Sequence, residues 1–192
     1  MKALVTGFDA FGGDAINPSY DAVSQLPARL GTLEIVTAQL PTSFKRAVPK
    51  LRALIKREQL DIVLCVGLAA DRPAISIERV AVNLDDARLP DNDGAMPKDK
   101  PVVRGGPAAY FSTLPVRRIA ARLNAEKIPC ELSLSAGAFV CNHVFYALMH
   151  LAAQSKRRQP LRAGFVHVPA LSVLSLDHMV RALHVTLEVT RR

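Results

Sequence analysis

Tryptophan is absent from this chain of 192 residues, and tyrosine occurs only three times. Proteins that hold single-stranded nucleic acid usually stack its bases on aromatic side chains beside a basic groove. The chain has a formal net charge of +8, but its basic residues are spread over predicted helix surfaces, a turn at 156–158 and the last two positions. No aromatic residue is interleaved with them. This pattern is typical of a solvated basic surface, and we expect no nucleic-acid partner.

Cysteine is scarce as well. Cys65, Cys130 and Cys141 are an odd number without a C-x-x-C pair, which argues against a disulfide framework and against a structural zinc site. The N-terminal stretch has one lysine and only a brief apolar run, so we expect neither a signal peptide nor a membrane span. A reducing, cytoplasmic setting without a bound metal fits best.

A nucleotide-binding motif is missing from the loop that follows the first apolar run. The stretch 6–13 contains neither G-x-G-x-x-G nor a Lys-Ser/Thr pair after its second glycine. Phe8 and Phe11 flank this loop instead and suggest the apolar wall of a pocket, although ordinary core packing explains either one alone equally well. We therefore expect no nucleotide site here.

What the chain does contain is an alternation of short apolar runs and segments of helical spacing, without an internal repeat or a linker. The runs expected as strands are 3–8, 33–40, 62–67, 74–84, 132–134 and 164–168. Helices are expected after Asn17-Pro18-Ser19, around 48–55, around 116–123, from Cys141 and around 176–187. A long polar connection, 85–106, interrupts the alternation, and loops of this length are usually functional or mobile.

This order predicts the fold class. Strands that alternate with helices favour an α/β fold, here a three-layer α/β/α sandwich with a mostly parallel, twisted sheet. A chain of 192 residues, 49% of them hydrophobic, is long enough to bury a sizeable core as one domain. We expect residues 1–192 to form that single domain.

Cys141 is the best nucleophile candidate. It follows a tight connection with small residues, 135–138, and opens a segment in which Val144, Leu148 and Leu151 share one helical face. The N–H groups and the positive dipole end of a helix N-terminus favour a thiolate, so a cysteine here is expected to have a pKa of roughly 3.5 to 7.5.

A cysteine nucleophile needs a base for its proton. His143 is two residues beyond Cys141, and on a helix it points away from it. His167 lies at the end of an apolar strand, one helix and one crossover after Cys141, so an adjacent parallel strand would bring both to one sheet edge. A lone strand histidine is more often a core residue, but this topology favours His167 as the base.

The base in turn needs a group that holds one tautomer of its ring. Glu78 is the leading candidate, because it stands in an apolar strand and is costly to bury without a partner. A structural ion pair with Arg72 or Arg79 is the alternative, and composition alone favours it. Four residues of the polar connection are weaker candidates, because we expect them to be solvated, and they show no metal-binding spacing: Asp85, Asp86, Asp91 and Asp93.

Several segments together resemble one family over nearly the full length of the chain, that of pyroglutamyl peptidase type I, also called pyrrolidone-carboxylate peptidase. These segments are Val5–Phe8, Phe11–Gly13, Asn17–Ser19, Glu78–Asn83, Pro90–Asn92, Ser135–Gly137, Cys141-Asn142 and Gly164–Pro169. The resemblance implies a Cys-His-Glu triad, whose positions fall on Cys141, His167 and Glu78. It also implies a cytosolic, cofactor-free homo-oligomer, a dimer or tetramer, that acts on peptides with N-terminal pyroglutamate.

The resemblance further implies where the substrate's lactam ring binds. The walls of its pocket would include Phe8, Phe11 and Phe139, with Asn17 and the backbone around Leu68 nearby. Three positions depart from the family's usual residues. Leu68 and Met96 stand where glutamine is usual, and Asp71 stands where glycine is usual. If a side chain is needed at the first position, the loss is about one hydrogen bond, roughly 0.5 to 1.5 kcal/mol.

Two other functions stay open from the residues alone. Another cysteine hydrolase or amidase of the same fold would keep Cys141, His167 and Glu78 but reject pyroglutamyl substrates. A non-catalytic binding domain would need none of them.

Overall fold

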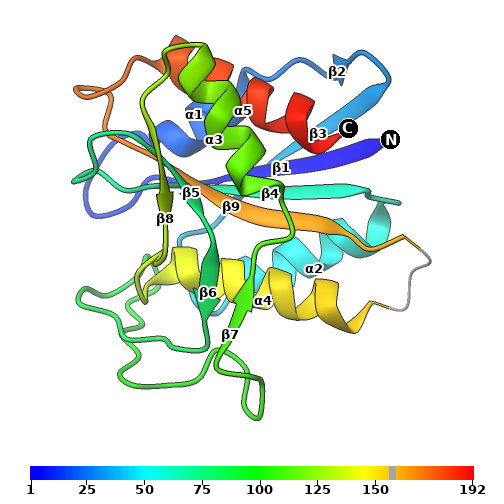
Figure 1. Ribbon diagram of the computed structural model, residues 1–192. Helices are drawn as coiled ribbons and strands as arrows, with labels where there is room; N and C mark the ends of the chain where they lie inside the picture. Colours follow the sequence, from blue (N-terminus) through cyan, green and yellow to red (C-terminus); the bar gives the residue numbers. More distant parts are fainter. Residues whose placement is uncertain (156–158) are drawn as a thin grey trace.

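A computed structural model describes residues 1–155 and 159–192, so the basic turn expected at 156–158 lies outside it (Figure 1). The strands are β1 Lys2–Phe8, β2 Arg29–Leu30, β3 Leu33–Leu40, β4 Ile62–Leu68, β5 Ile75–Glu78, β6 Val80–Val82, β7 Ala109–Phe111, β8 Cys130–Ser133 and β9 Arg162–Val168. The helices are α1 Pro18–Ser24, α2 Ala47–Arg57, α3 Val116–Ala125, α4 Val140–Gln154 and α5 Leu176–Thr190.

The main sheet of the described residues has seven strands in the order β2-β3-β1-β4-β9-β5-β8. Strands β3, β1, β4 and β9 are parallel to one another, whereas β5 runs antiparallel to β9. At the two sides, β2 is antiparallel to β3 and β8 is parallel to β5. The prediction of a mostly parallel sheet is confirmed. The sequence does not predict β2 and β7, because strands this short show no alternating pattern.

Helices cover both faces of the sheet and complete the three layers. In Figure 1, α1, α3 and α5 lie above the sheet, and α2 and α4 lie below it. Side chains of β1 alternate between the two cores, since Ala3 and Val5 belong to the upper one and Leu4 and Phe8 to the lower one. A strand buried on both faces therefore appears in the sequence as a continuous apolar run. No helix in residues 1–155 and 159–192 is long and apolar enough to cross a membrane.

The single strand predicted for 74–84 is wrong, because the chain changes sheets at Arg79. Strand β5 ends at Glu78, and β6 pairs with β7 in a separate two-stranded sheet. The reason lies in the side chain of Asn142, which accepts the N–H of Val82 at 3.0 Å and donates to its carbonyl at 2.9 Å. These bonds occupy the backbone of β6 and hold it on the first turn of α4.

The expected adjacency of His167 to the strand before Cys141 is also wrong. Strand β8 precedes Cys141, and β5 lies between β8 and β9. Parallel neighbours need a crossover of about a dozen residues or more, but the connection from β4 to β5 is only 69–74. Strand β5 therefore returns antiparallel, and β9 fills the place between β4 and β5. As a result, β5 places Glu78 beside β9.

Candidate active site

Cys141 and His167 lie at the same edge of the sheet. The carboxyl ends of β1, β4 and β9 meet there, and ligands of open parallel sheets bind at such edges. Gly67 of β4 pairs with His167 of β9. Helix α4 begins at Val140, one residue before the expected start, so Cys141 is in its first turn. A Cβ on Gly67 would lie 2.8 Å from Cys141 Sγ, which puts the sulfur over the residue that pairs with His167.

Glu78 is the hydrogen-bond partner of the imidazole. Its Oε1 lies 2.7 Å from Nδ1 of His167. Glu78 pairs with Phe165, two residues before His167 on the same face, so the carboxylate reaches the ring along the diagonal of the sheet. Glu78 is fully buried, and His167 is 3% exposed. Because a carboxylate only accepts hydrogen bonds, Nδ1 carries the proton and Nε2 is the nitrogen left to act as a base.

The same carboxylate oxygen also binds Arg72. Its Nη1 lies 2.6 Å from Glu78 Oε1, and its Nη2 lies 2.7 Å from the carbonyl oxygen of Ser135. The ion pair weighed as the alternative to a triad therefore exists together with the His167 contact. Among the described residues, Arg79 forms no ion pair with Glu78, and Glu78 Oε2 is buried without a hydrogen-bond partner.

The expected low pKa of Cys141 is wrong. Burial raises the pKa of its thiol to about 12, and the negative charge of Glu78 adds to the rise. Arg72 acts in the opposite direction but does not offset these effects. The helix N-terminus is outweighed because the sulfur is enclosed by protein and lies near a buried carboxylate. Cys141 is therefore a thiol near neutral pH, and it would need a base to remove its proton before it could act as a nucleophile.

A small cavity opens beside the sulfur. Its volume is about 150 Å³, below the roughly 300 to 1,000 Å³ of pockets for drug-sized ligands. Its lining is Phe8, Phe11, Asp14, Ile16, Asn17, Thr42, Leu68, Phe139 and Cys141. The ring centroids of Phe11 and Phe139 are 5.0 Å apart, and Phe44 packs edge-on against Phe139 at 5.4 Å. All five residues expected at the lactam pocket, with Leu68 expected through its backbone, line one mostly apolar cavity together with Cys141.

Asn17 has a structural task at this cavity. Its Oδ1 accepts the N–H of Ser19 at 3.1 Å and so caps α1, while its Nδ2 donates to the carbonyl of Asp9 at 2.9 Å. Both ends of the amide are thus occupied by the protein. Of the positions that depart from the family's usual residues, Leu68 lines the cavity, whereas Asp71 and Met96 are exposed and do not.

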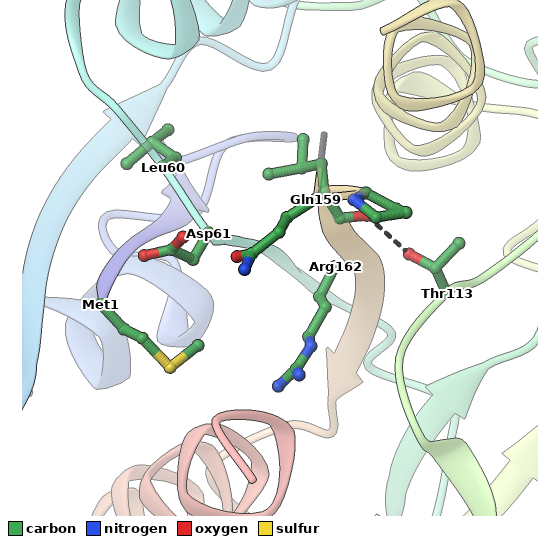
Figure 2. Close-up of a pocket in the computed structure, with 8 residues that line it drawn as sticks. Met1, Leu60, Asp61, Thr113, Gln159 and Arg162 are labelled. Atoms are coloured by element: carbon green, nitrogen blue, oxygen red, sulfur yellow. Dashed lines mark hydrogen bonds between the residues drawn. The ribbon is translucent and has the colours of Figure 1, made fainter. Parts of the chain in front are cut away.

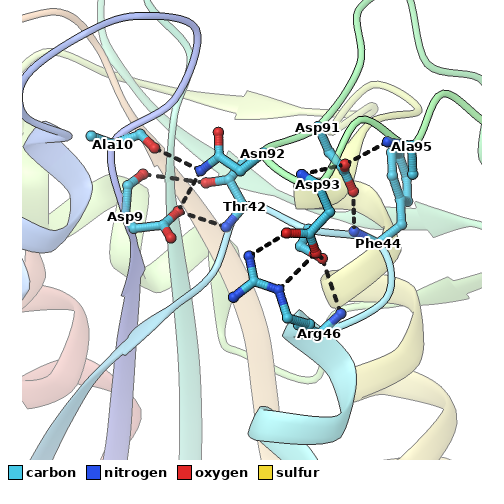
Figure 3. A network of polar contacts seen from close by, with 10 residues as sticks. Asp9, Ala10, Thr42, Phe44, Arg46, Asp91, Asn92, Asp93 and Ala95 are labelled. Atoms are coloured by element: carbon cyan, nitrogen blue, oxygen red, sulfur yellow. Dashed lines mark hydrogen bonds and ion pairs between the residues drawn. The ribbon is translucent and has the colours of Figure 1, made fainter.

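The long connection 85–106 is tied to the cavity by polar contacts (Figure 3). Asn92 Nδ2 lies 3.2 Å from Asp9 Oδ1 and 2.8 Å from the carbonyl of Ala10. Asp9 Oδ1 also accepts the N–H of Thr42 at 2.6 Å. Because Thr42 lines the cavity, these bonds connect the loop to the wall of the site.

The expectation that the aspartates of this connection are solvated is wrong for two of them. Asp85 and Asp91 are only 6% and 5% exposed. Asp91 accepts the backbone N–H of Phe44 at 2.8 Å, and Asp85 Oδ2 lies 2.8 Å from His143 Nδ1. Periodicity cannot reveal such burial, because the partners come from distant segments. No group of three or more His, Cys, Asp or Glu side chains in the described residues is placed to hold a metal ion.

Larger cavities lie elsewhere in the described residues, and two of them have volumes well above that of the small cavity. One, of about 550 Å³, shares the wall of Phe11 and Phe139 and extends over Leu84, Arg88 and Gly137. The other, of about 480 Å³, lies near the amino ends of β1, β4 and β9. Figure 2 shows its labelled lining residues, Met1, Leu60, Asp61, Thr113, Gln159 and Arg162. Of these cavities in the described residues, only the small one has the candidate nucleophile Cys141 in its lining.

Comparison with known proteins agrees with this geometry. The sequence profile of pyroglutamyl peptidase matches residues 1–191. Pyrrolidone-carboxylate peptidases of Treponema denticola and Gloeobacter violaceus are 41% and 45% identical, over 98% and 100% of this chain and 92% and 97% of theirs. The crystal structure of Bacillus amyloliquefaciens pyroglutamyl peptidase I has a TM-score of 0.93 at 43% identity, covering 98% of this chain and 96% of that one. A mutant pyrrolidone carboxyl peptidase of Pyrococcus furiosus has a TM-score of 0.95 at 38% identity, covering 100% and 98%. This chain therefore belongs to the pyroglutamyl peptidase family.

Proposed function

We propose that this chain is a cysteine peptidase that removes an N-terminal pyroglutamyl residue from peptides. In this proposal Cys141 is the nucleophile, His167 the acid and base, and Glu78 the group that orients the imidazole. One observation carries these roles: the sulfur lies over Gly67, beside a histidine whose Nδ1 is 2.7 Å from a fully buried carboxylate. Family membership supports the choice of substrate.

The reaction begins with Cys141 as a thiol. His167 Nε2 takes the proton while the sulfur attacks the pyroglutamyl carbonyl carbon. The C–N bond then breaks, and His167 gives the proton to the departing amine, which leaves as the shortened peptide. Water, deprotonated by the same nitrogen, attacks the thioester; pyroglutamate is released and the thiol re-forms. Glu78 stabilises the imidazolium in each step.

The first turn of α4 supplies donors for the oxyanion. The first backbone bond of the helix is from the N–H of His143 to the carbonyl of Phe139, so the N–H groups of 140–142 have no partner within the helix. The residue that caps α4 provides no side-chain hydrogen bond either. Donors of this kind point toward developing negative charge at a helix N-terminus, and losing one typically costs about 10² to 10³ in rate.

The two adjoining cavities suit the two parts of the substrate. A lactam ring carries no ammonium group, and the small cavity beside Cys141 has mostly apolar walls, with Asp14 exposed at its rim. The 550 Å³ cavity on the other side of the Phe11 and Phe139 rings has room for the first residues of the peptide that departs. This division explains how an exopeptidase can hold a single ring firmly and accept varied peptides behind it.

The setting belongs to the proposal as well. A cytoplasmic location is supported by three free cysteines, Cys65, Cys130 and Cys141. A homo-oligomer is supported by two apolar side chains that the described monomer leaves largely exposed, Phe111 at 68% and Leu134 at 66%. Sedimentation of the purified protein measures the oligomer number directly.

Hydrolysis of pyroglutamyl p-nitroanilide tests the function. The prolyl and glutamyl p-nitroanilides are matched controls, because proline keeps the ring without the lactam carbonyl and glutamate keeps the carbon skeleton without the ring. We expect release of nitroaniline from the pyroglutamyl compound alone. Equal rates with the prolyl compound would indicate another amidase of the same fold. No turnover of any of the three would favour a non-catalytic binding domain.

A further inference from the structure

We propose that Arg72 is a positioning residue: its guanidinium joins the carboxylate of Glu78 to the turn before Cys141 and so sets the imidazole and the sulfur relative to each other. The inference rests on the proposed function and adds a residue to its machinery. Arg72 is not in the lining of the small cavity, and its hydrogen bonds go to Glu78 and Ser135, so it acts through other groups.

Two hydrogen bonds from one planar group carry the argument. Nη1 is 2.6 Å from Glu78 Oε1, the same atom that contacts His167, and Nη2 is 2.7 Å from the carbonyl of Ser135. The Arg72 side chain is 21% exposed, and that of Glu78 is fully buried. A guanidinium is rigid and presents several donors in fixed directions, so its two partners are held at a fixed separation.

The first bond gives Glu78 a permanent counter-charge. A buried carboxylate is costly without a partner, and Glu78 Oε2 has no hydrogen-bond partner among the described residues. Without Arg72, His167 would be the only described hydrogen-bond partner of this carboxylate, and charge balance would favour a lasting imidazolium. An imidazolium cannot accept the thiol proton. Arg72 therefore supplies the counter-charge of Glu78, so that His167 does not have to supply it and can act as the base.

The second bond holds the turn that delivers the nucleophile. The start of this turn is exposed, with Leu134 at 66%, and Gly137 adopts a positive φ of 77°. Ala136 and Phe139 pack against the lower core, but Leu134 and Ser135 do not, so the Arg72 bond to the carbonyl of Ser135 helps to fix the part of the turn that lacks apolar packing. Because the turn leads directly into α4, a shift there is transmitted to Cys141. A misplacement of about 1 Å is enough to cost roughly 10²-fold in rate.

Electrostatics at the sulfur agrees with this geometry. Burial is the main reason why the pKa of Cys141 is high, and Glu78 raises it further, but the positive charge of Arg72 lowers it. The charged and titratable groups that act on the thiol in this way are Glu78, Arg72 and Cys65. Removing Arg72 would make the proton harder to remove and the base less able to remove it.

The test compares Arg72→Met, Arg72→Lys and Arg79→Met. Arg79 is the matched control because it follows Glu78 directly in the chain and forms no ion pair with it in the described residues. For Arg72→Met we expect kcat with pyroglutamyl p-nitroanilide to fall by about 10 to 10²-fold with KM within about twofold. The acidic limb of the rate profile should move to higher pH. Arg72→Lys keeps the charge and should recover part of kcat, and Arg79→Met should match the unmodified chain.

A second measurement keeps the inference separate from the choice of substrate. Iodoacetamide modification of Cys141, followed by mass spectrometry of its peptide, should be about 10-fold slower in Arg72→Met, with Cys130 as the internal reference. If the unmodified chain hydrolyses the amide and Arg72→Met keeps both kcat and the pH profile, the inference fails while the function stands. If the unmodified chain is inactive, the function fails, and the Cys141 modification rates alone decide: equal rates overturn the role of Arg72, and slower modification supports it. Unfolding curves of each variant show whether only stability has changed, which would also overturn the role.

Discussion

The cavities at the two ends of the central strands differ in the groups that surround them. At the carboxyl ends a cavity of about 150 Å³ adjoins Cys141, and behind it lies the buried contact between His167 and Glu78. Near the amino ends a cavity of about 480 Å³ has both apolar and polar lining residues, and several of the polar ones have protein partners. Asp61 there accepts the N–H of Lys2 at 2.7 Å, and Arg162 donates to the carbonyl of Thr190.

Because cavities of about 550 and 480 Å³ lie at the carboxyl and amino ends respectively, volume does not distinguish the two ends, and the groups that each end buries do. At the carboxyl end a carboxylate is fully buried, a thiol has its pKa raised by burial, and backbone N–H groups at a helix start lack partners within the helix. These groups are costly to keep in a folded protein and useful when charge develops in a reaction. The described lining of the amino-end cavity contains no buried thiol and no fully buried carboxylate, and the side chains of Asp61, Thr113 and Arg162 all have hydrogen-bond partners within the fold.

The largest expected effect comes from the nucleophile. Cys141→Ser should lower kcat/KM for pyroglutamyl p-nitroanilide by roughly 10³-fold or more, because removing a member of a catalytic unit disables the unit. His167→Ala should give a loss of the same order. The measurement is nitroaniline release, with circular dichroism to verify folding.

Cys130→Ser is the matched control for the nucleophile. Cys130 is a free cysteine at the start of β8 and is not in the lining of the small cavity. Its substitution should leave kcat/KM within about twofold of the original. Full activity in Cys141→Ser would remove the basis for distinguishing the two ends of the sheet.

Gly67 and Gly164 provide the next test, because neither position has room for a side chain. A Cβ on Gly67 would lie 2.8 Å from Cys141 Sγ, and one on Gly164, nearer the amino end, would lie 2.4 Å from Ser112 Oγ. Both alanine variants should lose about 1 to 3 kcal/mol of unfolding free energy through overpacking. Only Gly67→Ala should also lose activity, by about 10²-fold, since it displaces the sulfur. Equal activities in the two folded variants would contradict the placement of Cys141 over β4.

These glycines also illustrate what sequence reasoning can and cannot reach. The apolar run that ends at Gly67 predicts β4, and the strand ending in His167 predicts a sheet edge, because such signals are local. The approach of Cys141 to Gly67 is not local, since it depends on how α4 packs. For the same reason the sequence identifies Glu78 as a buried acid but cannot show that one oxygen serves His167 and Arg72 together.

Two further misses have the same cause. The antiparallel return of β5 follows from the short connection 69–74 combined with the later insertion of β9, and no periodicity records the order of strands in a sheet. The pKa of Cys141 was expected to follow its place in the helix, but burial and Glu78 decide it. Asn142 binds the backbone of β6 and so holds β6 on α4. Its place among apolar residues of a predicted helix was the available signal that its side chain has a partner inside the fold.

A third prediction concerns the loss of stability at high pH that follows from burying the thiol of Cys65. Burial raises the pKa of Cys65 to about 12 from an ordinary 9.0. A thiol with a raised pKa contributes stability that is complete below pH 9.0 and is lost as the pH rises toward 12. The contribution of Cys65 to the loss near pH 10.5 should be about 2 kcal/mol, at 1.36 kcal/mol per pKa unit. Urea unfolding at pH 8 and pH 10.5 measures the total loss, and Cys65→Ala should reduce it by about this amount, leaving the contribution of Cys141, whose pKa burial also raises to about 12. An equally steep dependence in Cys65→Ala would assign the alkaline loss to other groups.

The smallest expected effect belongs to the amino end. Asp61→Asn and Gln159→Ala alter the lining of the larger cavity, and both should leave kcat/KM within about twofold, because no reacting group lies there. Asp61→Asn should lower the unfolding free energy by about 0.5 to 1.5 kcal/mol, since Asp61 accepts the N–H of Lys2 and an amide oxygen accepts it less strongly. Gln159→Ala controls for the change in cavity shape. A tenfold loss of activity in either variant would show that the two ends are coupled through the strands, and the larger cavity would then have to be treated as part of the catalytic system.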